Sequence, residues 1–336
     1  MSDDLEKLVE RTAAGDPRAV GRLISLVEDG ASDPEGTSSL RDATALLVAR
    51  VAASGRRAQV VGLTGSPGVG KSTTTSALVA AYRAAGRRVG VLAVDPTSPF
   101  SGGALLGDRV RMQEHALDDG VFIRSMASRG HLGGLSWATP QALRVLDVAG
   151  CDVVLVETVG VGQAEVDIAA LADTTAVLVA PGMGDAIQAA KAGILEIADV
   201  FVVNKADRDG AEQTSRDLRH MLTLGEKPDP GEWTPPIVLT VASQGSGIDD
   251  VVSAVAAHRE WLSREGRLEA RQRRRAADEI EAIALGGVRR RLASIHGSAS
   301  LSELASDLMA GSTDPYAAAD RVLGELGADA GADSSA

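Results

Sequence analysis

Residues 59–72 read QVVGLTGSPGVGKS, an apolar run followed by a glycine-rich loop. The loop fits the spacing G-x-x-x-x-G-K-[ST], and it lies between a predicted strand that ends at Thr64 and a predicted helix that begins at Lys71. Glycines let backbone N–H groups turn inward around a phosphate at the positive end of a helix. A lysine there contacts the β and γ phosphates, and a serine hydroxyl is offered to Mg²⁺. The predicted phosphate-binding residues of this P-loop are Gly65, Ser66, Pro67, Gly68, Val69, Gly70, Lys71, Ser72 and Thr73.

Short apolar runs alternate with amphipathic stretches on the C-terminal side of this loop. Several runs are continuous in Val, Leu and Ile, as expected for strands that are buried on both faces of a parallel sheet. Their alternation with helices is typical of βαβ units. The sequence therefore predicts an α/β fold, a P-loop NTPase with a doubly wound, mainly parallel sheet. The predicted strands cover residues 59–64, 89–94, 121–124, 152–157, 175–180, 200–204 and 237–241, and the predicted helices residues 71–85, 141–149, 185–198, 211–224 and 248–262.

Helical patterns flank this domain at both ends of the chain. Residues 1–55 predict an N-terminal helical extension, and residues 56–262 the P-loop GTPase domain. Residues 263–326 predict a C-terminal helical extension, whose apolar positions are too sparse for a core of its own. We expect it to be either a surface helix or a helix that contacts a partner chain. Residues 327–336 predict a disordered tail.

Acidic residues at or after predicted strand ends are candidates for the metal site and for hydrolysis. Glu157 begins Glu-Thr-Val-Gly, which has the form of the γ-phosphate-sensing D-x-x-G turn with Glu in place of Asp. Asp95 closes another apolar run, at the sheet edge where doubly wound folds bind ligands. Asp108 follows in a loop, near the metal or the attacking water. The predicted catalytic residues are Lys71, Asp108 and Glu157, and the predicted Mg²⁺ ligands are Ser72, Asp95 and Glu157.

Residues 204–207, NKAD, directly follow an apolar run and match the N-K-x-D element that recognises a guanine base. A carboxylate at Asp207 can accept hydrogen bonds from N1–H and from the 2-amino group of guanine, whereas adenine has no such pair of donors. When the wrong base would leave buried polar groups of the site unpaired, the site discriminates against that base by a factor of roughly 10⁴. The sequence therefore predicts GTP and GDP rather than ATP as ligands. The predicted base-contacting residues are Asn204, Lys205, Asp207, Val241, Ala242 and Ser243.

Two features bear on the rate and control of hydrolysis. Val161 follows Gly160, at the position where many G proteins have the glutamine that orients the attacking water. We therefore expect slow hydrolysis until a partner completes the site. Asp185, Gln188 and Lys191 stand at i, i+3 and i+6 at the start of a predicted helix, after a glycine-rich turn. Such a helix start can move with the nucleotide state, so we predict a switch at these residues.

The composition argues against several functional classes. The chain has 34 Lys and Arg against 46 Asp and Glu, a formal charge of −12, which disfavours an extended nucleic-acid ligand. A single cysteine, Cys151, allows no intrachain disulfide, and the five histidines are scattered at no metal-ligand spacing. The acidic N-terminus has no apolar signal segment, and no run of about 18 apolar residues occurs. We expect a cytoplasmic protein without membrane attachment.

Together the motifs resemble the ArgK/MeaB family, G proteins associated with adenosylcobalamin-dependent methylmalonyl-CoA mutase. The resemblance covers about residues 5–295 and is carried by GSPGVGKS, AVDPTSPFSGGALLGDRVRM, RGHLGGLS, ETVGVGQ, PGMGDAIQAAKAGILEIAD and NKAD. It implies a GTP-hydrolysing chaperone that gates cofactor loading of such a mutase and protects or reactivates it. It also implies a homodimer formed through the C-terminal helical extension. By matching motif, it implies metal roles for Asp95 and Glu157, a hydrolytic role for Asp108, and a mutase-responsive switch at Asp185, Gln188 and Lys191.

Other functions stay open at this stage. An ATP-dependent kinase of a transport protein, a label this family has carried, is disfavoured because NKAD reads guanine. A nickel or other metal insertase shares the fold but is disfavoured by the lone cysteine and the dispersed histidines. Membrane targeting in the manner of signal-recognition particles would need a Met-rich helical domain, whereas the whole chain has six methionines. Nucleotide preference and a metal titration distinguish the first two from a mutase chaperone.

Overall fold

The computed structural model describes residues 2–32, 38–95, 112–115, 117–127, 138–158, 164–182, 194–224, 231–295 and 299–332. Contacts between Cα atoms divide the chain into two units, residues 1–272 and residues 273–336. The first unit contains the sheet, and the second is helical in its described residues.

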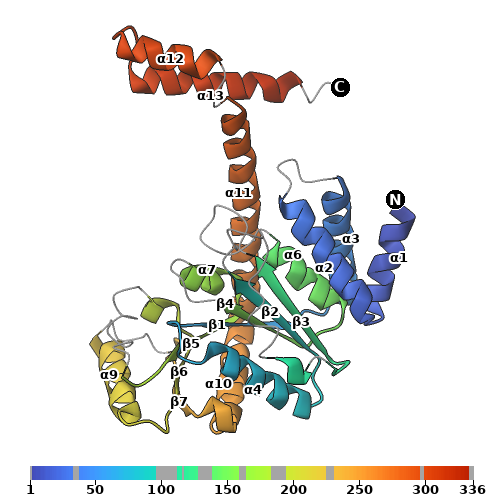
Figure 1. Ribbon diagram of the computed structural model, residues 1–336, viewed down its shortest axis with the longest axis vertical. Coiled ribbons are helices and arrows are strands. Elements are labelled where there is room, and N and C mark those ends of the chain that lie inside the picture. The colour runs from blue at the N-terminus through green and yellow to red at the C-terminus, as the bar shows by residue number, and fades with distance from the viewer. Residues whose placement is uncertain are drawn as a thin grey trace. The chain divides into compact units, whose positions relative to one another are not determined.

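The first unit is built on one seven-stranded sheet with the strand order β3-β2-β4-β1-β5-β6-β7 (Figure 1). All neighbouring strands pair in parallel. The predicted doubly wound α/β fold is therefore confirmed. The strands are β1 Gln59–Thr64, β2 Val89–Asp95, β3 Val121–Ala127, β4 Val153–Thr158, β5 Thr174–Val179, β6 Val200–Asn204 and β7 Ile237–Thr240.

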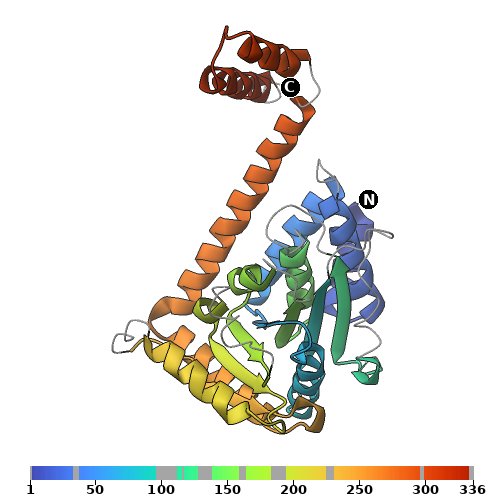
Figure 2. The ribbon, with the colours of Figure 1, turned by 60° about the vertical axis from the view of Figure 1, so that its left-hand side comes forward.

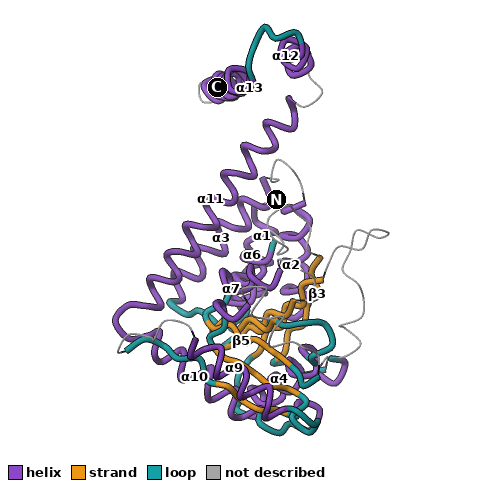
Figure 3. The backbone as a smooth tube through the Cα atoms, turned by 90° about the vertical axis from the view of Figure 1, so that its left-hand side faces the viewer, coloured by secondary structure: helices purple, strands orange, loops and turns teal. Residues whose placement is uncertain are grey.

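Helices cover both faces of the sheet, which explains the continuous apolar runs (Figures 2 and 3). Along β4, Val154 and Val156 pack in a cluster with two helices, α2 (Pro17–Ser32) and α6 (Thr139–Val148). Val153 and Leu155 pack in a second cluster with α4 (Lys71–Ala84) and α10 (Ile248–Ser263). Each strand side chain thus alternates between two cores. The helices around the sheet are α4 Lys71–Ala84, α6 Thr139–Val148, α7 Ala164–Leu171, α9 Ala211–Leu224 and α10 Ile248–Ser263, and the short 3-10 turns are η1 Gln113–His115, η2 Ile194–Ile197 and η3 Ala242–Gln244.

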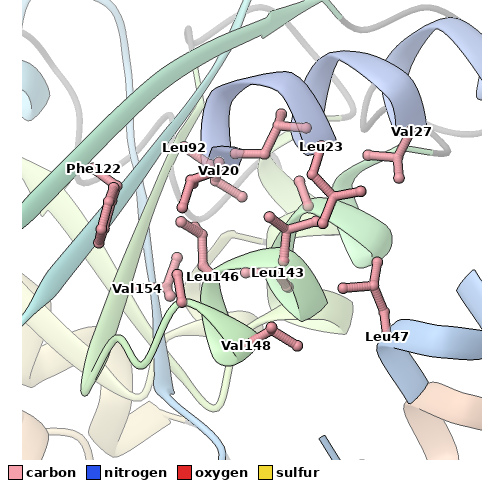
Figure 4. Close-up of a cluster of buried hydrophobic side chains, with 14 of the residues drawn as sticks. Val20, Leu23, Val27, Leu47, Leu92, Phe122, Leu143, Leu146, Val148 and Val154 are labelled. Atoms are coloured by element: carbon pink, nitrogen blue, oxygen red, sulfur yellow. The ribbon is translucent and has the colours of Figure 1, made fainter. Parts of the chain in front are cut away.

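The N-terminal helices extend one of these cores. The helices α1 Ser2–Ala13, α2 Pro17–Ser32 and α3 Ser38–Ser54 pack on one another and on α6. Figure 4 shows Val20 and Leu23 of α2 facing Leu143 and Leu146 of α6, all of them buried, with Leu47 of α3 nearby. Apolar side chains at helical spacing therefore join the N-terminal extension to the face of the sheet that α6 covers.

Most predicted elements occur within a few residues of their observed bounds, and two differ. α7 was not predicted at all. The helix predicted over residues 185–198 is described only from Ile194, where it forms the 3-10 turn η2 rather than an α-helix; residues 183–193 lie outside the described residues.

The C-terminal helices are α11 Arg267–Ile295, α12 Ala299–Met309 and α13 Pro315–Ala332. Glu265, at φ 57°, interrupts the helical path between α10 and α11, where the 3-10 turn η4 Arg264–Gly266 lies. α13 ends at Ala332, within residues 327–336 of the predicted tail. Along α11, exposed apolar side chains recur on successive turns: Ile280, Ile283, Leu285 and Val288.

An aromatic cluster fixes the first turn of α11 to the amino end of β6. Trp233 and Trp261 pack on His258, with ring centroids 4.8 and 5.6 Å from the imidazole. The Trp233 indole N–H donates to the Asp199 carbonyl oxygen at 2.7 Å, and the Arg271 guanidinium pairs with the Asp199 carboxylate at 3.2 Å. Burial lowers the pKa of His258. The beginning of α11 is therefore joined by charge and by ring packing to the residue that precedes β6.

Candidate nucleotide-binding site

The predicted site residues lie at the carboxyl ends of β1, β4 and β6. In the sheet, β1 lies between β4 and β5. From β1 the chain continues to β2 on the β4 side of the sheet, and after β4 it crosses to β5 on the opposite side of β1. The strand order therefore reverses beside β1, which is where doubly wound folds bind ligands. The carboxyl ends of β1 and β4 both lie at this edge.

The loop between β1 and α4 adopts a conformation that needs glycine at two positions. Gly65 has φ 139°, and a Cβ atom there would lie 2.2 Å from the Leu178 carbonyl oxygen. Gly70 has φ 100°, and a Cβ atom there would lie 2.4 Å from the Asn204 side-chain nitrogen. L-residues rarely adopt such φ values, and neither site has room for a side chain. Gly65 and Gly70 are therefore required by the backbone path and by neighbours on β5 and β6.

Lys71, the first residue of α4, holds its ammonium inside this loop. The side chain is 7% exposed, and Nζ donates to the carbonyl oxygens of Gly65 at 2.6 Å and Ser66 at 3.1 Å. A cation is thus fixed at the N-terminus of a helix, where the helix dipole also favours an anion. The arrangement suits a phosphate, as the sequence predicted for Lys71.

Glu157, at the end of β4, meets the first turn of α4. The Ser72 hydroxyl donates to Oε1 of Glu157 at 2.5 Å, and the Thr75 hydroxyl donates to Oε2 at 2.8 Å. The predicted neighbours Ser72 and Glu157 are therefore brought together. Thr75 was not predicted, although its spacing of three residues from Ser72 on a helix was a usable signal. The side-chain atoms that meet here are all oxygens, the ligand type that Mg²⁺ prefers.

Several predicted residues lie wholly or partly outside the described residues. The backbone of Asp95 is described: β2 pairs with β4 so that Val94 lies opposite Thr158, one residue after Glu157, and Asp95 is the last residue of the strand. Asp95 thus ends beside β4 at the same sheet edge. The side chain of Asp95, all of Asp108, and the predicted switch residues Asp185, Gln188 and Lys191 lie outside the described residues.

Asn204, the last residue of β6, connects the phosphate loop to the loop after β7. Its Nδ2 donates to the Val69 carbonyl oxygen at 2.8 Å. Its Oδ1 accepts from the Thr240 hydroxyl and from the Ala242 backbone N–H, both at 3.1 Å. Asn204 is 3% exposed, so these bonds are shielded from water. The first residue of NKAD therefore makes direct contact with both neighbouring loops of the site.

The remaining residues predicted to contact the base surround this joint. Lys205 has φ 57°, which is uncommon for a lysine, and its Nζ donates to the Gly68 carbonyl oxygen at 2.5 Å. Asp207 is exposed, two residues further on, as is Ser243 of η3, whereas Ala242 is buried and Val241 is partly buried. The NKAD element and residues 241–243 therefore flank the P-loop, with the Asp207 carboxylate accessible to a ligand.

Other chemistry is not indicated in the described part of the chain. Residues 2–32, 38–95 and the later described ranges contain no group of three or more His, Cys, Asp or Glu side chains that could hold a metal ion. Burial raises the pKa of Cys151 to about 12, so its thiol stays protonated. No described helix is both long and apolar enough to cross a membrane.

Comparison with known proteins identifies the family. A family model described as methylmalonyl-CoA mutase-associated GTPase MeaB matches residues 20–296. A Pyrococcus abyssi protein provisionally named as a GTPase is 46% identical over 323 residues, which cover 96% of this chain and 97% of the relative. GTPase ArgK of Escherichia coli is 36% identical over 270 residues, 79% of each chain.

One solved structure supports the fold over nearly the whole chain. The crystal structure of a LAO/AO transport system kinase aligns with a TM-score of 0.71 at 24% identity, covering 96% of this chain and 97% of that one. At this identity the similarity concerns the fold alone. The matches to the family model and to ArgK, together with the P-loop and NKAD geometry, lead to one conclusion: the chain belongs to the MeaB family of methylmalonyl-CoA mutase-associated GTPases.

Proposed function

We propose that this chain binds GTP and GDP together with Mg²⁺ and hydrolyses GTP to GDP and phosphate. The observation that carries the proposal is the joint made by Asn204, which bonds the P-loop at Val69 and the loop after β7 at Ala242. Because of this joint, a phosphate-binding loop and a guanine-reading element belong to one site. The exposed carboxylate of Asp207 is then available to the N1–H and 2-amino donors of guanine.

Phosphoryl transfer is accelerated mainly by positioning and by charge, and the residues of this site supply both. Lys71 would exchange its bonds to the Gly65 and Ser66 carbonyls for bonds to the β and γ phosphate oxygens, where negative charge develops. Backbone N–H groups at the start of α4 would bind the β-phosphate. We keep Asp108 and Glu157 as the candidates that serve hydrolysis.

Glu157 near the end of β4 and Ser72 in the first turn of α4 offer oxygen ligands of the kind that Mg²⁺ binds. Ser72 and Glu157 present a hydroxyl and a carboxylate within 2.5 Å of each other, and Asp95 ends the neighbouring strand. Mg²⁺ would neutralise phosphate charge when bound. We propose that Ser72 holds it directly, and that Glu157 and Asp95 hold it directly or through water.

We further propose that the chain acts as a chaperone of an adenosylcobalamin-dependent methylmalonyl-CoA mutase, or of a related acyl-CoA mutase, in the cytoplasm. The family's own description as mutase-associated supports this partner. Hydrolysis should be slow without the partner, since Val161 stands where a water-orienting glutamine is usual. The switch would comprise Asp185, Gln188 and Lys191.

A homodimer through the C-terminal extension, residues 263–326, completes the proposal. The exposed apolar side chains of α11, among them Ile280 at 69% and Ile283 at 50%, support it because exposed apolar surface is stabilised by a second apolar surface. Sedimentation of the full chain, compared with Ile280→Glu, tests it. The substitution should convert a dimer into a monomer.

The central experiment is GTP hydrolysis by the purified protein, alone and with a methylmalonyl-CoA mutase from the same cell, with ATP measured in parallel. The proposal expects slow GTP turnover, faster turnover with the mutase, and no ATP turnover. GTP turnover that does not respond to the mutase would contradict the chaperone role but would still support the proposed GTPase activity. ATP turnover would favour a kinase instead.

A further inference from the structure

Glu157 is a buried carboxylate with apolar neighbours in its own sheet. Its side chain is 1% exposed, and its register partners on the two adjacent strands are Leu63 of β1 and Ala93 of β2. Residues two apart on a strand share a face, so Glu157 lies on the same side as Leu155, toward the core that α4 covers. The residues directly opposite Glu157 on the neighbouring strands are therefore both apolar.

Two hydroxyl donors to Glu157 come instead from the first turns of α4. Ser72 donates to one carboxylate oxygen and Thr75 to the other. The two hydroxyls are three residues apart, about 4.5 Å along the helix axis, and lie on one helix face. The positive end of the helix dipole also favours a carboxylate here. Each oxygen of Glu157 thus has its own hydroxyl partner.

The two hydroxyls cannot serve the site in the same way. Ser72 follows Lys71 directly in the phosphate-binding motif, and its hydroxyl is the one proposed to contact Mg²⁺. Thr75 is 0% exposed, and its hydroxyl also lies 3.0 Å from the Lys71 carbonyl oxygen of its own helix. A fully buried threonine has no access to a ligand in solvent, so it can act only through the groups it touches.

We infer that Thr75 is a positioning residue for the proposed magnesium site: its hydroxyl holds one oxygen of Glu157 and thereby aims the other at Ser72. The inference rests on the proposed function. Partners of metal-binding side chains orient those side chains, and their loss typically costs about 10- to 100-fold in metal affinity or activity. Without the Thr75 hydroxyl, the Glu157 carboxylate loses a buried bond and can rotate away from Ser72.

The test is a Mg²⁺ titration of the affinity for fluorescent GDP, made on the full chain without any turnover. Thr75→Val removes the hydroxyl and keeps the shape, and Thr75→Ser keeps the hydroxyl. Thr75→Val should raise the Mg²⁺ concentration for half-maximal effect by about tenfold or more, and Thr75→Ser should restore it to within about threefold. If Thr75→Val does not fold, Thr75→Ala carries the same expectation.

The matched control is Thr74→Val. Thr74 is the preceding residue, is equally buried, and donates its hydroxyl to the Gly70 carbonyl oxygen at 3.0 Å instead of to Glu157. It should keep the Mg²⁺ dependence of the unaltered chain. Equal Mg²⁺ dependence in Thr75→Val and the unaltered chain would overturn the inference, as would an equal shift in Thr74→Val. An unaltered chain whose GDP affinity ignores Mg²⁺ would overturn the proposed metal site as well.

Discussion

Replacing Asn204 with alanine should loosen the joint between the phosphate loop and the base-reading loops. The change removes one donor, to the Val69 carbonyl, and one acceptor, shared by the Thr240 hydroxyl and the Ala242 N–H. Asn204 is 3% exposed, so water cannot readily replace the lost bonds. The three partner groups would then remain buried without Asn204, and the P-loop would lose its contact with β6.

The expected magnitude follows from counting these partners. A buried group that loses its hydrogen-bond partner costs about 1 kcal/mol or more, so three such groups give a loss of about 3 kcal/mol in the free energy of unfolding. For a unit of this size, each kcal/mol corresponds to about 2–4 °C, which gives a fall of about 6–12 °C in Tm. Guanine-nucleotide affinity should fall at least about tenfold, which is about 1.4 kcal/mol.

Urea unfolding and thermal melting of the nucleotide-free chain measure the stability, and fluorescent GDP measures the affinity. Thr240→Val is the control, because it removes one of the three bonds and leaves the contact with Val69. It should cost about 1 kcal/mol and change the affinity less than about twofold. A loss below about 1 kcal/mol in Asn204→Ala, or equal affinities in the two variants, would refute the reasoning.

Three more outcomes are expected. Lys71→Ala should lower GTP turnover by about 100-fold, because the ammonium no longer meets the developing phosphate charge; a steady-state phosphate assay that shows unchanged turnover would contradict the P-loop role. Asp207→Asn should weaken GDP by about 100-fold and admit xanthosine diphosphate, measured by competition, and a retained guanine preference would argue against base reading. Burial raises the pKa of Asp147 to about 6, above its unfolded value near 3.9, so the folded chain holds more protons than the unfolded chain and the free energy of unfolding should fall as the pH rises from about 4 to about 6. In Asp147→Asn, the free energy of unfolding measured with urea should depend less on pH across that window, and an unchanged pH dependence would speak against this role of Asp147.

The sequence was most informative where strands are buried on both faces. β6 and α9 have the predicted bounds, because the run Val200–Asn204 is apolar up to its polar end and α9 begins after the turn at Gly210. α7 was missed because residues 164–171 are short and mostly small or apolar, so they show no polar face at helical spacing. Its Ile168 is fully buried, which only the packing reveals.

Short motifs predicted which residues belong to the candidate site, but not which of them contact one another. Glycine and lysine positions in the P-loop follow from local backbone and charge requirements, which a short motif encodes. The bond from Asn204 to Val69 joins residues far apart in the sequence, and its existence depends on β6 and β1 belonging to one sheet. The contact of Thr75 has the same origin: Thr75 is on α4, and its partner Glu157 lies on β4, 82 residues away in the sequence. Long-range partners follow from topology, and the sequence pattern alone does not list them.

The aromatic cluster beside α11 provides an optical reporter within the natural chain. Two of the chain's three tryptophans, Trp233 and Trp261, pack on the His258 imidazole. Arg271 of α11 pairs with the carboxylate of Asp199, and the carbonyl oxygen of Asp199 accepts a hydrogen bond from the Trp233 indole. Indole emission depends on the polarity of the surroundings and on quenching by nearby side chains. With Trp137 replaced by phenylalanine, intrinsic fluorescence would therefore follow the contact between the amino end of β6 and the start of α11 in real time, without an attached label.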